Sequence, residues 1–197
     1  MENTQKKSSF VTKLGSDLVL GILVVVLSVF TALSAYQSTV YDGEQADMNA
    51  EGQQFLTDSN SLYLEANQFV LYDYSMYDGW YINKDQNEEL AGYFHENFSD
   101  ELLESLSREQ GPFDDPYYDE MYVDAENAYD EAMQRFEAGR RAGYLAQRMQ
   151  LVVFIMAVGL ALSAYASLLK SENKMRIVLA ICALVSAITS LVFYLSV

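Results

Sequence analysis

Two hydrophobic stretches close the chain and constrain its fold more than any other feature. Residues 151–169 and 177–197 contain no acidic or basic side chain, and each is long enough to cross a bilayer as a helix. A short basic linker joins them. The pattern predicts a transmembrane hairpin with crossings at 149–170 and 177–197 and a loop at 171–176.

A third hydrophobic run lies near the N-terminus, at residues 18–36. It follows a polar segment with Lys6, Lys7 and Lys13, a layout shared by cleaved secretory signals and uncleaved signal anchors. The run is longer than a usual signal core and continues the helical pattern without a break. We therefore favour a signal anchor, with a transmembrane helix at 17–36 capped by Ser16 or Asp17, over a cleaved signal.

The basic residues predict an orientation for these crossings. The N-terminal lysines and the basic residues of the linker belong on one side of the membrane, which the positive-inside rule makes cytoplasmic. Three arginines between 140 and 148 flank the second crossing on the other side and oppose this assignment. We expect a multi-pass integral membrane protein with a cytoplasmic tail at 1–16, a cytoplasmic loop at 171–176 and an extracytoplasmic domain at 37–148.

The segment between the first and second runs is strongly acidic. Residues 37–148 hold 25 of the 28 Asp and Glu side chains but six Lys or Arg side chains, a net charge of −19. Such a surface repels nucleic acid and anionic headgroups, so we expect no nucleic-acid partner. We expect cationic partners instead, either basic proteins or divalent cations held on the acidic face.

The acidic segment also has the spacing of packed helices. Its first half carries two columns of residues at a period of seven: Tyr41, Met48, Phe55, Leu62, Phe69 and Met76, beside Leu56, Tyr63, Val70 and Tyr77. Its second half follows the alternating 4-3 spacing of a coiled coil from Tyr118 to Ala146. One column there is wholly small and the other is mostly aromatic and includes Tyr129. The small column consists of Ala125, Ala132, Gly139 and Ala146.

These patterns predict an all-α protein with three transmembrane helices and an extramembrane antiparallel helical hairpin, or coiled-coil stalk. No proline follows Pro116, so one helix should continue from there into the second hydrophobic run. Asp115 is the expected N-cap of that helix, with Pro116 at its first position. Ser99 should cap a shorter helix that ends before Gly111.

Two groups of residues are candidate contact sites. An aromatic cluster could bind a partner or a glycan, or could be buried beneath residues 86–110; it comprises Tyr72, Tyr74, Tyr77, Trp80 and Tyr81. Small residues in the hydrophobic runs allow close helix packing within the chain or between copies. They are Gly159, Ser163 and Ser167 in the second run, with Ala183 and Ala187 in the third.

The layout resembles an uncharacterised family of bacterial membrane proteins, described only as a domain of unknown function. The matching features are the run at 18–36, the stretch at 60–85 with Trp80 and Tyr81, and the closing pair of crossings. The strongly acidic segment departs from the more balanced charge expected of such proteins. The resemblance implies the same topology and no activity.

The sequence contains no recognisable catalytic, cofactor-binding or metal-binding constellation. His95 is the only histidine, and position 92 is Gly, so even one Glu-x-x-His motif is missing. We expect a non-enzymatic integral membrane protein without a cofactor, whose acidic stalk mediates homo-oligomer assembly or binds a membrane-protein or other partner. The alternative is a small subunit of an oligomeric channel or transporter with the pore between copies.

Overall fold

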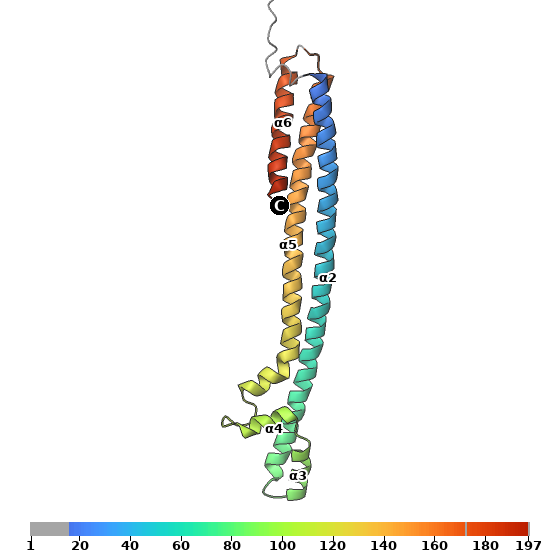
Figure 1. Ribbon diagram of the computed structural model, residues 1–197. Helices are drawn as coiled ribbons and strands as arrows, with labels where there is room; N and C mark the ends of the chain where they lie inside the picture. Colours follow the sequence, from blue (N-terminus) through green and yellow to red (C-terminus); the bar gives the residue numbers. More distant parts are fainter. Residues whose placement is uncertain (1–15, 172, 197) are drawn as a thin grey trace, which may run out of the picture. The chain divides into compact units, whose positions relative to one another are not determined.

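The computed structural model describes residues 16–171 and 173–196, and these residues form helices and short connections without a strand (Figure 1). The helices are α2 (Asp17–Asn83), α3 (Glu88–Glu96), α4 (Asp100–Ser107), α5 (Asp115–Leu168) and α6 (Lys174–Leu195). The prediction of an all-α fold is confirmed. Apart from Ser16, the N-terminal tail predicted at 1–16 lies outside the described residues.

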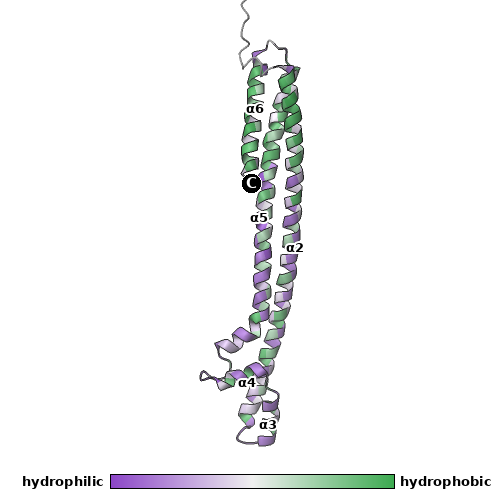
Figure 2. Cartoon of the chain, in the orientation of Figure 1, coloured by the Kyte–Doolittle hydropathy of each residue, from purple (hydrophilic) through white to green (hydrophobic). Residues whose placement is uncertain are grey.

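Three helices, α2, α5 and α6, are long and apolar enough to cross a membrane. Figure 2 shows hydrophobic residues over α6, the first part of α2 and the last part of α5, whereas the rest of α2 and α5 is mainly polar. These helices fit a multi-pass membrane protein, as the three hydrophobic runs predicted.

Both long helices extend well beyond the hydrophobic runs. α2 has 67 residues and passes Gly43 and Gly52 without a break, although glycine within a helix costs about 1 kcal/mol relative to alanine. α5 has 54 residues and continues from the acidic segment into the second hydrophobic run, as the absence of proline predicted. Packing against other helices therefore outweighs the weak local propensity at these glycines.

The chain divides into two compact units, of which the first comprises Met1–Asp47 and Ala138–Val197. In it the beginning of α2 and the whole of α6 pack against the end of α5, and both run antiparallel to it (Figure 1). One core cluster joins Leu20 to Ala166 and Ala180. A second core cluster consists of Leu27, Val152 and Met156.

Polar contacts hold the two ends of α6 in the first unit. Arg176 is buried, forms an ion pair with Asp17 and donates from Nη1 to the carbonyl oxygen of Leu169 at 2.9 Å. At the other end, Arg148 Nη2 donates to the hydroxyl of Ser196 at 2.8 Å. Asp17 therefore pairs with an arginine, while Ser16 accepts from the backbone N–H of Val19 at 3.4 Å.

The second unit, Met48–Glu137, contains the rest of α2, the short helices α3 and α4, and the beginning of α5. Here α2 and α5 also run antiparallel and approach closely, because small residues face one another. The Ser59 hydroxyl donates to the carbonyl oxygen of Ala125 at 2.8 Å. A Cβ on Gly52 would lie 3.0 Å from the Phe136 ring and 3.2 Å from the carbonyl oxygen of Ala132.

The connections in this unit follow the predicted boundaries with one correction. Ser99 caps α4, as predicted, by accepting from the N–H of Leu102 at 3.1 Å. The prediction that Asp115 caps α5 is wrong. Asp115 is the first helical residue, and the side chain of Asp114 accepts from the N–H of Tyr117 at 3.2 Å. Gly111 has φ of 89°, a left-handed conformation that favours glycine.

Candidate functional site

Four buried residues form the core of the second unit: Val70, Phe98, Leu102 and Tyr117. Trp80 and Tyr77 pack against this core from α2, and Phe113 packs against it from the turn before α5. Aromatic rings therefore fix α3 and α4 against the two long helices. Any binding surface on α3 and α4 is thus built on a rigid base.

Asp73 is a fully buried carboxylate in this core. Its Oδ2 accepts from the hydroxyl of Ser99 at 2.5 Å and from the hydroxyl of Tyr117 at 2.9 Å, and its Oδ1 accepts from the N–H of Ser99 at 3.3 Å. Burial, together with the hydrogen bond to Asp73, raises the pKa of Tyr117 well above its usual range. Tyr117 therefore remains a hydrogen-bond donor at physiological pH.

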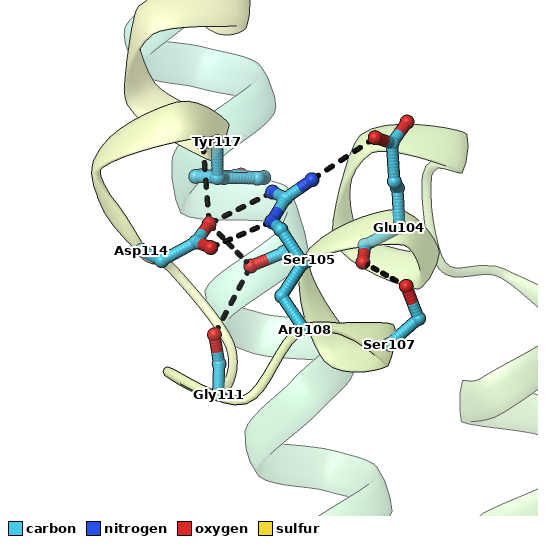
Figure 3. A network of polar contacts seen from close by, with 7 residues as sticks. All are labelled: Glu104, Ser105, Ser107, Arg108, Gly111, Asp114 and Tyr117. Atoms are coloured by element: carbon cyan, nitrogen blue, oxygen red, sulfur yellow. Dashed lines mark hydrogen bonds and ion pairs between the residues drawn. The ribbon is translucent and has the colours of Figure 1, made fainter.

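A second polar network closes the turn between α4 and α5 (Figure 3). The Arg108 guanidinium donates to both oxygens of Asp114, from Nε at 2.6 Å and from Nη2 at 2.8 Å. It also donates from Nη1 to Glu104 at 3.1 Å, while Ser105 donates to Asp114 Oδ1 at 3.0 Å. The hydrogen bonds from Arg108 lower the pKa of Asp114 from 3.8 to about 2, and the pair raises the pKa of Arg108. These bonds fix the turn and the start of α5.

A groove of about 490 Å³ lies on the surface of the second unit, beside this core. The α2 wall presents Glu65, Gln68, Phe69 and Tyr72, and the turn between α3 and α4 presents Asn97, Phe98 and Ser99, with Asp73 beneath. Phe69 is 53% exposed and Tyr72 is 45% exposed, although both are large aromatic side chains. The groove therefore combines exposed aromatic surface with the exposed carboxylate of Glu65.

The second unit contains far more acidic than basic side chains. Met48–Glu137 contains 22 acidic and three basic side chains, a net charge of −19. Each base already has partners within the unit. Arg108 forms ion pairs with Asp114 and Glu104. Arg135 forms ion pairs with Glu51 and Glu131. The Nζ atom of Lys84 lies 4.3 Å from the centroid of the Tyr81 ring. The unit thus presents a large excess of negative charge to its surroundings.

The structure separates the five aromatic residues that the sequence suggested as partner contacts. Tyr77 and Trp80 are half-buried in the core, each with its ring near that of Phe98. Tyr74 packs on Phe113 with ring centroids 4.2 Å apart and shares a hydrogen bond with Tyr118, whose pKa this bond raises to about 12. Tyr72 and Tyr81 are exposed, and Tyr74 is also partly in solvent despite these contacts. Of the five, Tyr72 lines the groove.

Most of the small residues suggested for helix packing are buried within the chain. Those with little or no exposure are Ala125, Ala132, Gly139, Ala146, Gly159, Ser163 and Ala183. A Cβ on Gly159 would lie 3.0 Å from Ser186 Cβ, so α5 and α6 approach closely there. Ala187 is half-buried, and Ser167 is exposed. Ser167 therefore lies away from the contacts between helices of this chain.

Sequence reasoning missed Phe69 and Asp73 as functional candidates. Phe69 belongs to a seven-residue column predicted to be core, yet it is half exposed; Tyr129, at 44% exposure, departs from its own column in the same way. Both columns return to the contact face one heptad later, at Met76 and Phe136, so these exposures depend on what packs locally against each residue. The buried positions near Phe69 are Ala66, Val70 and Asp73. An isolated Asp between tyrosines gives no sequence signal of burial.

The described residues contain no group of three or more His, Cys, Asp and Glu side chains placed to hold a metal ion. His95 is exposed on α3, with its ring centroid 5.0 Å from that of Phe98. An apolar pocket of about 140 Å³ lies in the first unit among residues such as Leu27, Phe30 and Ala187. Its lining consists of apolar side chains and carries no group suited to acid–base chemistry.

Comparisons with known proteins add no relative to this description. No protein-family model matches the chain, and neither the curated proteins nor the solved structures gave a match.

Proposed function

We propose that this chain is a non-enzymatic integral membrane protein that binds a cationic partner through the second unit on the extracytoplasmic side. One observation carries the proposal. Met48–Glu137 contains 22 acidic side chains and three basic ones, and each basic side chain already contacts a carboxylate or an aromatic ring within the unit. Clustered charge of one sign attracts partners of the opposite sign and speeds their encounter.

The same charge disfavours self-association through this unit. Two copies would bring two surfaces of net charge −19 together, and charges closer than about 8 Å are poorly screened at physiological ionic strength. Any homo-oligomer would therefore form through the membrane-spanning helices. The burial of Gly159, Ser163 and Ala183 inside one chain leaves fewer small residues for a pore between copies, and this favours a binding protein over a channel subunit.

Photo-crosslinking in the native cells tests the proposal. A photoreactive amino acid would replace Leu64, Tyr93 or Val123, which are 64%, 59% and 45% exposed in the second unit. We expect discrete adducts with another protein, and these should weaken in raised salt. Replacement of Val178, half exposed on α6, reports the background from membrane neighbours. The absence of adducts from every position in the second unit would contradict the proposal.

A further inference from the structure

We infer that the groove beside Phe69 and Tyr72 is the docking site and that its ligand is a protein segment carrying a lysine or arginine beside an apolar side chain. This inference rests on the proposed partner-binding function and adds its location and chemistry. It combines three properties of the groove, namely its exposed aromatic wall, its exposed carboxylate Glu65 and its packed base.

The aromatic wall provides a site for apolar side chains. Phe69 and Tyr72 are three residues apart on α2, so they lie on one face of the helix. Their exposed fractions of 53% and 45% leave about half of each side chain in water. Aromatic side chains in such a setting contribute strongly to binding when a partner covers them. A ligand that covers this wall must therefore present apolar surface.

The carboxylate of Glu65 provides the complementary site for a cation. Glu65 lies one helical turn before Phe69 and forms no ion pair within the described part of the chain. Asp73 also lines the groove, but it is fully buried and its oxygens already accept from Ser99 and Tyr117, so it fixes the groove wall and does not contact the cation. A lysine or arginine fits Glu65 and the aromatic wall together, because its alkyl stem packs on an aromatic ring while its charged end reaches the Glu65 carboxylate.

The groove is held in shape before any ligand binds. Phe98 is 7% exposed and belongs to the core, so the opposite wall is part of the packed interior. Ser99 caps α4 and donates to Asp73, which fixes the turn between α3 and α4. A rigid site loses little conformational entropy on binding, and a short peptide segment can therefore dock with measurable affinity.

Three other occupants fit these observations less well. A second copy of the chain would bring a second unit of net charge −19 to the same surface. Nucleic acid and anionic lipid headgroups are repelled for the same reason. A metal ion alone would leave Phe69 and Tyr72 uncovered, and the described residues offer it no group of three ligands. A cationic segment with an apolar side chain can both cover the aromatic wall and pair with the carboxylate of Glu65.

The test measures binding of synthetic peptides to the full chain in nanodiscs of zwitterionic phosphatidylcholine. The probe is a fluorescein-labelled octapeptide that alternates lysine and leucine, and its fluorescence anisotropy reports binding. One control peptide replaces lysine with glutamate, and another replaces leucine with serine. Empty nanodiscs give the background. We expect the lysine–leucine peptide to bind best and to weaken as salt rises.

Variants then locate the site. We expect Phe69→Ser and Tyr72→Ser to weaken binding about fivefold each, and Glu65→Gln about twofold to threefold, from the usual effects of aromatic anchors and exposed charges. Leu71→Ser and Glu126→Gln are matched controls, because both residues are exposed and lie outside the groove. These control variants should bind like the wild type.

The possible failures are distinguishable. If the wild type binds but the groove variants behave like the controls, the docking site is wrong and the cationic partner of the proposed function stands. If the serine-containing peptide binds as well as the leucine-containing one, the apolar half of the site is refuted. If the wild type prefers none of the peptides, the whole inference fails, and the crosslinking experiment alone decides the proposed function.

Discussion

Asp73 and Asp114 are two buried carboxylates in the same unit that are stabilised in different ways. Asp73 accepts hydrogen bonds from neutral groups, two from Ser99 and one from Tyr117. Asp114 binds a guanidinium through two short bonds from Arg108. Asp73 therefore has uncharged partners, whereas Asp114 is paired with a cation at the turn into α5. The two residues should respond differently to substitution.

Tyr117→Phe removes one of the three donors to Asp73 and leaves the ring in place. A buried carboxylate that loses a partner costs about 1–3 kcal/mol, so we expect the free energy of unfolding to fall by that amount. Urea denaturation in detergent micelles measures it, with Trp80 as the only tryptophan and a member of the same core. Tyr122→Phe is the control, because its hydroxyl donates to exposed Asn67 and should matter little. Equal effects of the two variants would contradict the importance of Asp73.

Asp114→Asn removes the ion pair with Arg108 and replaces one of its two acceptor oxygens with an NH2 donor, while the amide oxygen can still accept from the N–H of Tyr117. Arg108 lowers the pKa of Asp114 from 3.8 to about 2, so the ion pair stabilises the fold fully above about pH 4 and is lost as the pH falls towards 2. We expect the variant to unfold at a lower urea concentration than the wild type at neutral pH. The difference should shrink between about pH 4 and pH 2. A difference that stays constant over this range would show that the ion pair is not its source.

At the scale of helices, close approach depends on residues with little or no side chain. In the second unit, Ser59 and Gly52 of α2 meet Ala125 and Ala132 of α5. In the first unit, the Ser38 hydroxyl donates to the carbonyl oxygen of Ala146 at 3.2 Å. Such contacts bring two backbones together and leave little room for added atoms. At Gly79 of α2 the missing side chain instead leaves room for the Phe94 ring of α3.

Gly79→Ala should loosen the contact between α2 and α3. A Cβ at this position would lie 2.5 Å from the Phe94 ring, so the ring or the helix must move. Overpacking of this kind costs about 1–3 kcal/mol. Trp80 fluorescence during urea denaturation would report the loss. Gly92→Ala is the matched control on α3, since no atom lies within 4 Å of its Cβ, and it should stabilise the helix by about 0.5–1 kcal/mol. Stabilisation by both substitutions would contradict this account.

At the scale of the whole molecule, apolar and acidic residues are segregated along the same helices. The apolar lengths belong to α6 and to one end of α2 and of α5 (Figure 2). The acidic lengths of α2 and α5 lie in the second unit with α3 and α4. Lipid can cover the apolar lengths, and water can solvate the acidic lengths. Each segment is therefore stable in only one of these two environments.

The proposed orientation predicts the outcome of a reporter-fusion scan. Alkaline phosphatase fused after Asp100 should be active, because the enzyme matures outside the cytoplasm, whereas fusions after Gln5 and Asn173 should be inactive. The physical reason is that the lysines of the N-terminal tail and the bases of the linker are retained on the cytoplasmic side. A cytoplasmic reporter with the opposite pattern of activity provides the control. Inactive phosphatase after Asp100 would reverse the proposed orientation.

Much of the helical architecture could be predicted from the sequence because it depends on local chemistry. Hydrophobic runs free of charge require helices in lipid, and Ser99 supplies a cap to the nearest N–H groups. Because no proline follows Pro116, α5 continues without a break. The cap of α5 was misplaced by one residue, because Asp114 and Asp115 are chemically alike and only the bonds to Arg108 and Tyr117 distinguish them.

The candidate site could not be predicted in the same way. The sequence by itself determined which segments are apolar, acidic and helical, because these properties follow from side-chain chemistry and its spacing along the chain. Only the tertiary structure decided that Trp80 is packed, that Phe69 is exposed and that Asp73 is buried between Ser99 and Tyr117. These outcomes depend on which residues distant in sequence cover each side chain, and spacing along one helix does not contain that information.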